Sequence, residues 1–218
     1  MLSAACSGRP APLVPEPLAP VPLDSVTAWV GVLGPTRPTA LRFRWRYRDE
    51  RRSIGGRGTA RVSPPDSLRV DWAAILGLSP GAAVVVGDSL QWADPKDDYP
   101  SSVAPAVQLL WTTLGVVRPP RAGTAVFGGR DSTRVLWRFV EQRDTLDFRL
   151  RSADVRTLEA EWRRDGHLMA RSRTLLGPAG LPASARIDVP ERSARFDLTF
   201  VAVDSTAIFA PTLWRSPR

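Results

Sequence analysis

Cysteine is almost absent from this chain, since Cys6 is the only one among 218 residues. A single cysteine cannot close an internal disulfide, so the core must hold the fold together. A chain of this length can bury enough surface for that, because the buried fraction rises with size. Long apolar runs are also missing: no segment approaches the roughly 20 apolar residues that a membrane-spanning helix needs. The composition predicts one domain of ordinary size, with or without a tail.

Histidine and asparagine are scarce too, and this bears on catalysis. Gly87-Asp88-Ser89-Leu90 spells the nucleophile block of the GDSL hydrolases, which resemble one another in also using an asparagine and an Asp-x-x-His segment. This chain has no asparagine, and its only histidine, His167, follows Asp165-Gly166. A serine without a base and oxyanion donors gains little reactivity. We therefore expect no catalytic residue, and Gly87-Asp88 is interpreted as a hairpin turn.

Metal ligands are equally sparse. One cysteine and one histidine far apart cannot build a zinc site without carboxylates, and Asp94, Asp97 and Asp98 lack the ligand spacing of a calcium loop. The glycine-rich stretch 55–58 lacks the following helix that makes such a loop a phosphate cradle, so it predicts a bend or bulge. The sequence therefore predicts no metal and no cofactor.

The basic residues raise the question of a nucleic-acid partner, because the formal charge is +8. Lys96 is the only lysine, and the arginines are spread along the chain instead of forming one tract. A groove that tracks phosphates is expected to cluster its cations and to interleave exposed aromatic residues. We see neither pattern and expect no nucleic acid as partner.

The first residues resemble the end of a bacterial lipoprotein signal. Ala4 and Ala5 suit the two positions before a lipidated cysteine, although Ser3 stands where leucine or valine is usual and most of the apolar signal region is missing. Six prolines follow in residues 8–23, spaced so that neither helix nor sheet is expected. Residues 1–23 are thus interpreted as a lipid attachment site at Cys6 plus a semi-rigid linker, with a free thiol on a disordered tail as the alternative. The folded domain is expected over 24–218.

Alternation of apolar and polar residues dominates the domain. Apolar residues at 41, 43, 45 and 47 alternate with arginines at 42, 44, 46 and 48, which is typical of a strand with one dry and one wet face. The pattern recurs at 68–72, 146–151, 158–163 and 195–200, and polar turns such as Arg143-Asp144 and Asp165-Gly166 join neighbouring runs. It predicts an antiparallel, sequentially connected sheet of about eleven strands.

Two helices are expected beside the strands. The spacing of Val26, Trp29, Val30 and Leu33 predicts a short helix capped at Asp24 or Ser25 and stopped by 34–35. A central helix is predicted from the apolar face of residues 103–114, with Ser101 or Ser102 as cap and Gly115 at its end. Its apolar face needs a surface to cover, and the concave face of the sheet is the natural one.

This arrangement resembles the LolA/LolB lipoprotein-carrier superfamily. The resemblance rests on the order of three segments: 67–72 (SLRVDW) followed by 76–81 (LGLSPG), 107–115 (VQLLWTTLG) and 180–188 (GLPASARID). The lipoprotein-like start points to the membrane-anchored LolB branch. The resemblance implies a mainly β fold, a half-open antiparallel barrel closed by helices that holds acyl chains. It also implies a monomeric lipoprotein at the periplasmic face of the outer membrane.

Within such a barrel, large apolar residues are the candidate ligand contacts. They are Phe43, Trp45, Tyr47, Val70, Trp72, Leu110, Trp111, Leu114, Trp137, Phe139, Phe148 and Trp162. Plain core packing is the commoner role of such residues. The resemblance also implies a membrane-contacting loop at Ile75, Leu76 and Leu78, and these could equally fold back into the core.

Three functions stay open from the sequence. The first is a non-enzymatic envelope lipoprotein that binds an acyl chain or a lipoprotein. The second is a structural or sensory lipoprotein of the same fold with a filled core, and a basic nucleic-acid-binding β-protein is a distant third.

Overall fold

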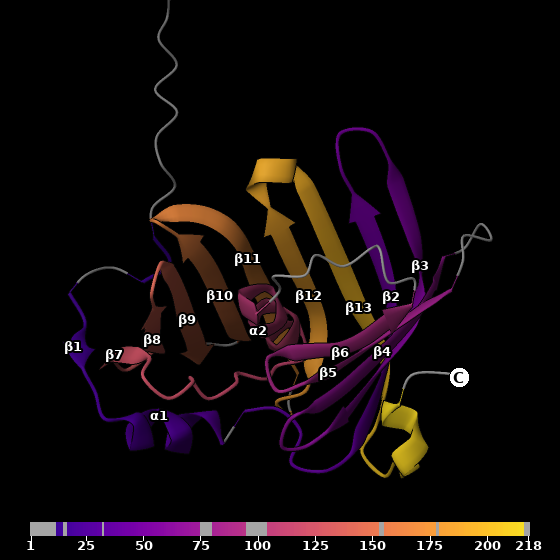
Figure 1. Cartoon of the computed structure of the whole chain (residues 1–218), viewed down its shortest axis with the longest axis horizontal. Helices are drawn as coiled ribbons and strands as arrows, with labels where there is room; N and C mark the ends of the chain where they lie inside the picture. Colours follow the sequence, from indigo (N-terminus) through magenta and orange to yellow (C-terminus); the bar gives the residue numbers. More distant parts are fainter. Residues whose placement is uncertain are drawn as a thin grey trace, which may run out of the picture.

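The computed structural model describes residues 12–14, 17–31, 33–74, 80–94, 104–152, 155–177 and 179–215. In this described part, two α-helices and two short 3-10 helices accompany thirteen strands. One α-helix precedes the first long strand and the other lies at the centre of the chain (Figure 1). The helices are α1 (Leu23–Val30), α2 (Ala104–Thr113), η2 (Pro190–Arg192) and η3 (Pro211–Trp214). The strands are β1 (Ala19–Pro20), β2 (Thr39–Arg48), β3 (Ser53–Ser63), β4 (Ser67–Ala74), β5 (Gly81–Val86), β6 (Ser89–Asp94), β7 (Ala125–Arg130), β8 (Arg134–Glu141), β9 (Asp144–Ser152), β10 (Arg156–Arg164), β11 (His167–Leu176), β12 (Pro182–Val189) and β13 (Ala194–Asp204).

All the strands form one antiparallel sheet in the order β1-β7-β8-β9-β10-β11-β12-β13-β2-β3-β4-β5-β6. Two meanders, β2–β6 and β7–β13, meet where β13 pairs with β2, with Leu198 opposite Trp45. The sheet curves around α2 and does not close, because its edge strands β1 and β6 lie at opposite ends of that order (Figure 1). The predicted fold class, an open antiparallel half-barrel with an N-terminal and a central helix, is confirmed, with thirteen strands among the described residues.

The predicted turns explain why neighbouring strands pair. Gly87-Asp88 joins β5 to β6, with φ +60° at Gly87, so the GDSL block is a hairpin turn as expected. Asp165 and Gly166 join β10 to β11 and both have positive φ (49° and 74°), as two-residue hairpin turns require. The turn before β9 lies one residue earlier than expected, with φ 53° at Gln142.

The helix ends differ slightly from the sequence expectation. Helix α1 begins at Leu23 with Pro22 as its cap residue, so Asp24 and Ser25 lie in its first turn instead of capping it. Asp24 is still placed favourably there, since the helix N-terminus carries partial positive charge. Helix α2 ends as expected before Gly115, whose φ of +77° suits glycine. Ser101 and Ser102 lie outside the described residues.

The glycine-rich stretch of β3 was expected to bend or bulge, and this expectation is wrong. Strand β3 pairs with β2 and β4 without a register shift. Gly56 lies opposite Trp45 and Gly58 opposite Phe43, and a Cβ atom on either would lie within 2.7 Å of the facing ring. The glycines therefore provide flat backbone on which the aromatic rings of the neighbouring strand lie.

Part of the proline-rich segment belongs to the folded structure, contrary to the expectation that no sheet forms there. Ala19 and Pro20 form β1, which pairs with β7, and the amide of Val21 donates to the carbonyl of Val126 (3.1 Å). Proline is tolerated here because β1 is an edge strand. Only one of its sides pairs with another strand, so a missing amide donor on the other side breaks no hydrogen bond of the sheet.

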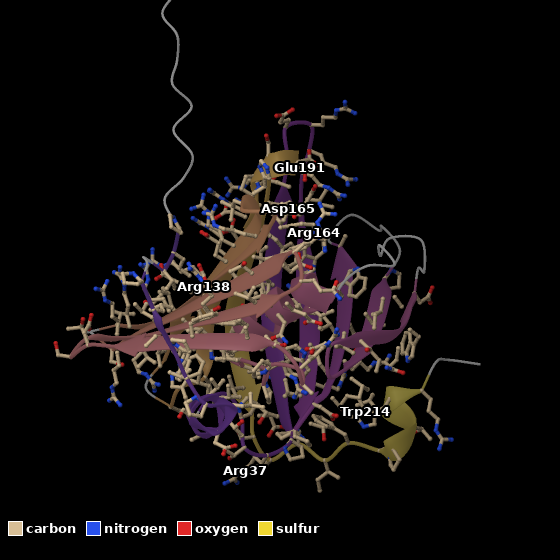
Figure 2. All side chains as sticks on the ribbon, turned by 60° about the vertical axis from the view of Figure 1, so that its left-hand side comes forward. Arg37, Arg138, Arg164, Asp165, Glu191 and Trp214 are labelled. Carbon is tan, nitrogen blue, oxygen red and sulfur yellow. The ribbon has the colours of Figure 1, made fainter. Side chains whose placement is uncertain are left out.

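Residues 12–14 contact the outer face of β8–β10. Val14 is fully buried; its carbonyl accepts a hydrogen bond from Arg138 Nη2 (3.0 Å), whereas the carbonyl of Leu13 accepts one from Arg149 Nη1 (3.3 Å). Figure 2 places Arg138 close to this indigo segment. The segment helps to cover Asp147 and Glu161, which the alternation had placed on a wet face. That assignment is wrong for β9 and β10, because a distant part of the chain lies over them.

Candidate functional site

Helix α2 lies on the concave face of the sheet and is hydrogen-bonded to both meanders. On one side the Thr112 and Ser172 hydroxyls are 2.6 Å apart, and Thr174 Oγ1 donates to the carbonyl of Thr112 (2.8 Å). On the other side Trp111 Nε1 donates to the carbonyl of Gly87 (2.9 Å). These bonds fix α2 between β11 and the β5–β6 turn. They therefore set the direction in which the apolar side chains of α2 point toward the sheet.

Asp88 adds a polar contact at the same place. Its carboxylate accepts hydrogen bonds from Gln108 Nε2 (2.7 Å) and from Arg121 Nε (3.3 Å). Burial raises the pKa of the Asp88 carboxyl, against the opposing effect of the nearby cations Arg121 and Arg118. Asp88 therefore positions α2. The adjacent Ser89 begins β6 while His167 begins β11, and these strands are not neighbours in the sheet, so strand pairing does not bring this serine and histidine together.

Helix α2 divides the apolar interior into two clusters. We call the first the β7–β11 cluster; Phe148, Phe139, Trp137, Leu158 and Leu150 pack there with Val26 of α1 and Leu109 of α2. The second, the β2–β5 cluster, joins Leu41, Phe43, Trp45, Ala60 and Leu68 to Val107, Trp111 and Leu114 of α2. The last three residues follow the i, i+4, i+7 spacing and so share one face of the helix.

Several predicted ligand contacts lie inside these clusters. Trp137, Phe139 and Phe148 are buried in the first, where Trp137 packs on Trp29 of α1 with ring centroids 5.5 Å apart. Trp111, Leu114, Phe43 and Trp45 are buried in the second. Because Trp111 and Phe148 retain 1% and 0% of their accessible surface, protein surrounds both side chains on all sides.

Other predicted contacts remain half-buried at the margin of the β2–β5 cluster. They are Tyr47, Val70, Trp72 and Leu110. Ile54, Phe196 and Phe200 occupy the same margin and were not among the predicted residues. The pairing register explains their position: Phe196 and Ile54 lie opposite Tyr47, and Phe200 opposite Phe43. The alternation of β13 already put Phe196 and Phe200 on its apolar face, but only the pairing with β2 brings them to the site.

The half-buried residues form one surface, which we call the concave apolar surface: Tyr47, Ile54, Val70, Trp72, Leu110, Phe196 and Phe200. Its rings rest on the buried layer beneath, since Phe196 stacks on Trp45 (5.9 Å) and Phe200 meets Phe43 edge-on (6.0 Å). Half-buried apolar side chains beside a helix suit an extended apolar ligand.

Comparison with solved structures identifies the architecture. A LolA superfamily protein from Nitrosomonas europaea superposes with a TM-score of 0.59 over 90% of this chain and 98% of its own, at 11% sequence identity. The fold is LolA/LolB-like. A putative outer membrane lipoprotein-sorting protein domain from Vibrio parahaemolyticus matches with a TM-score of 0.53, at 8% identity, over 82% of this chain and 89% of its own. No protein-family model and no curated protein matches the sequence.

In this LolA/LolB-like fold, Trp162 lies apart from the concave apolar surface. It is half-buried at the edge of the β7–β11 cluster, and its Nε1 donates to Asp144 Oδ1 (2.8 Å). Burial alone would raise the pKa of Asp144, but hydrogen bonds from Arg164 and Trp162 outweigh it and hold that pKa below its usual value. Trp162 is thus tied to a polar network where β9 begins and β10 ends, away from the turn that joins these two strands.

The remaining predicted positions lie outside the described residues. These are Cys6, the proposed lipid attachment site, and Ile75, Leu76 and Leu78 of the expected membrane-contacting loop. The same holds for Asp97 and Asp98. Among the described side chains, no group of three or more metal-ligating residues is found. Within the same part of the chain, no helix has the length and hydropathy needed to cross a bilayer.

Proposed function

We propose that this protein is a non-enzymatic carrier of the bacterial envelope that binds an acyl chain, free or attached to a lipoprotein, on the concave apolar surface. The observation that carries the proposal is the row of half-buried apolar side chains beside α2, on a fold shared with a putative lipoprotein-sorting domain. An acyl chain laid along this row would remove both its own methylenes and the protein's aromatic surface from water. Each buried methylene contributes about 0.8 kcal/mol, so about ten of them, fewer than a common acyl chain carries, supply the roughly 8 kcal/mol of micromolar binding.

Leu110 is the residue of α2 best placed to contact such a ligand. It is half-buried, whereas its neighbours Leu109 and Trp111 are buried in the two clusters. A charge at Leu110 would disturb the ligand surface without entering the packed core. Phe196, on the opposite side of the surface, tests the sheet contribution separately.

Binding of a fluorescent fatty acid to the full chain tests the proposal. We expect saturable binding. Leu110→Glu and Phe196→Ser should each weaken it about tenfold or more, because each change removes apolar contact area worth about 1.5 kcal/mol or more, and about 1.4 kcal/mol corresponds to a tenfold change in Kd. Val155→Glu is the matched control, since Val155 is 55% exposed and lies before β10, away from the surface. Equal affinity in all four proteins would contradict the proposal, as would the absence of binding in the unmodified chain.

We further propose that Cys6 carries the lipid anchor of a monomeric protein that resides at the periplasmic face of the outer membrane. The linker is shorter than the expected 1–23, since residues 12–14 and β1 already contact the sheet. The small residues before Cys6 support the lipid anchor. Ile75, Leu76 and Leu78 would then contact the membrane. The test is to express the protein behind a complete lipoprotein signal in cells that are fed a radioactive fatty acid. The label should enter the protein and should not enter its Cys6→Ser variant.

A structural or sensory lipoprotein of the same fold is the second candidate. The full burial of Trp111, Leu114 and Phe148 favours it, because α2 already fills part of the interior. Native mass spectrometry of protein purified from an envelope separates the two functions. A co-purifying lipid indicates a carrier, and its consistent absence indicates a filled core.

A further inference from the structure

The outer face of the sheet carries a groove that gathers arginines from distant parts of the chain. It has a volume of about 960 Å³ and is lined by six arginines from β2, β3, β11 and β12: Arg44, Arg46, Arg48, Arg57, Arg173 and Arg186. Strand pairing brings them together, since Arg44 lies opposite Arg57, and Arg46, Asp197, Arg186 and Arg173 follow one another across four strands. The sequence expectation that the cations are not clustered is therefore wrong.

The positive charge of the groove is poorly compensated. Asp197 is the single carboxylate of its lining, and it already accepts from Arg186 Nε (2.7 Å). Arg173 reaches Glu159 only at 4.0 Å. Within the described part of the chain, Arg44, Arg46, Arg48 and Arg57 have no carboxylate at ion-pair distance, and their side chains are exposed. Like charges directly opposite on neighbouring strands destabilise a sheet, so the Arg44–Arg57 pair is unfavourable without an anion.

We propose that this groove binds the phosphate headgroups of an anionic membrane surface. The size of the array supports several simultaneous anions: Arg44 to Arg48 span about 14 Å along β2, and the five strands from β11 to β3 span about 19 Å. A single small phosphate cannot meet charges spread so widely, whereas a bilayer surface offers many. Guanidinium groups suit this role because they donate bidentate hydrogen bonds to phosphate oxygens.

The groove is less suited to nucleic acid. Binding of single strands uses exposed aromatic rings on which bases stack. Trp45 is the only aromatic residue of the lining, it is 9% exposed, and its ring lies over Gly56 on the concave side. The charge is thus present without the stacking surface.

This site does not depend on the proposed acyl-chain site. Strand β2 directs Arg44, Arg46 and Arg48 to the outer face and Phe43, Trp45 and Tyr47 to the concave one. Substitutions in the groove are therefore expected to leave fatty-acid binding unchanged, so failure of one proposal is distinguishable from failure of the other.

Co-sedimentation of the full chain with vesicles tests the inference. We expect binding to vesicles of equal parts phosphatidylglycerol and phosphatidylcholine at low salt, and none to phosphatidylcholine alone. Each arginine near an anionic surface strengthens binding about fivefold, so Arg44→Gln/Arg46→Gln/Arg57→Gln should weaken it about a hundredfold. Binding should also fall in about 1 M salt, where the Debye length shrinks to about 3 Å.

The matched control is Arg37→Gln/Arg130→Gln/Arg215→Gln, which removes the same charge from exposed arginines outside the groove. Figure 2 shows Arg37 at the lower end of the molecule. Retention of binding in this control is expected, and equal loss in both triple variants would overturn the site. Unchanged binding of the groove variant would overturn it as well.

Two further arms distinguish other anions. If soluble tripolyphosphate displaces the protein from vesicles at equal phosphate concentration, the ligand of the groove is a free phosphate compound and not a membrane surface. An oligonucleotide that binds more tightly than the vesicles, and loses binding in the groove variant, would replace it with nucleic acid. Either result would overturn the membrane assignment.

Discussion

Replacement of Asp147 by alanine is expected to lower the free energy of unfolding by about 3 kcal/mol. Asp147 lies on β9 with a side chain only 1% exposed, and Arg138 of β8 donates to both of its oxygens (2.7 and 3.0 Å). An arginine cannot release its proton in a protein, so removal of the carboxylate takes a bidentate partner from a guanidinium that stays charged. Breaking such a pair costs about 3–5 kcal/mol, and the 13% exposure of Arg138 favours the lower end because water can reach part of the guanidinium.

Urea unfolding followed by tryptophan fluorescence measures this loss, and the eight tryptophans provide the signal. With an m-value of about 3 kcal/mol per molar urea, the midpoint should fall by about 1 M with m unchanged. Arg143→Gln is the control, because it breaks the exposed Arg143–Asp165 pair without changing the positive-φ residue of the turn, and we expect a much smaller loss from it.

The double variant Arg138→Met/Asp147→Leu separates loss of the charge pair from loss of packing. If a guanidinium that lacks the Asp147 carboxylate causes the loss, this variant should recover most of the stability, because both charges are gone. A midpoint for Asp147→Ala equal to that of Arg143→Gln would refute the reasoning. So would a double variant as unstable as Asp147→Ala.

Three other outcomes are expected from the structure. Gly56→Ala should destabilise the sheet by about 1–3 kcal/mol and alter the emission of Trp45, because the new Cβ would lie 2.0 Å from the carbonyl oxygen of Ala73. Gly177→Ala should have little effect, since its Cβ would lie 3.5 Å from the nearest atom. A larger loss of stability in Gly177→Ala than in Gly56→Ala would contradict the packing argument. Val14→Asp should lower the unfolding midpoint and raise the protease sensitivity of residues 12–22, because it replaces a fully buried apolar side chain by a carboxylate. An unchanged midpoint would mean that residues 12–14 contribute no stability. Stability should be lost as the pH falls below the ordinary aspartate pKa of 3.8, which unfolding midpoints measured at several acidic pH values would show. Hydrogen bonds lower the folded-state pKa of four carboxyls, so the unfolded chain takes up protons first; they are Asp49, Asp131, Asp165 and Asp204. A midpoint that rises in acid would contradict this expectation.

The candidate site was predictable only in part. The alternation of residues 41–48 predicted that Tyr47 lies on an apolar face, and the spacing of α2 predicted the same for Leu110. Ile54 and Phe196 become neighbours of Tyr47 through pairing of β2 with β3 and β13. Periodicity assigns a face within one strand, but it does not state which strand, more than a hundred residues away, lies beside it.

The sequence by itself determined the fold class and the local elements. Period-2 alternation specified strands because one face must leave water, and turn residues with positive φ specified where each strand reverses. The tertiary structure alone decided what covers each face. It placed Val14 over the charges of β9 and β10, and it gathered arginines from β2, β3, β11 and β12 into one groove. Burial and charge clustering depend on contacts between distant segments, and a pattern along one strand carries no information about them.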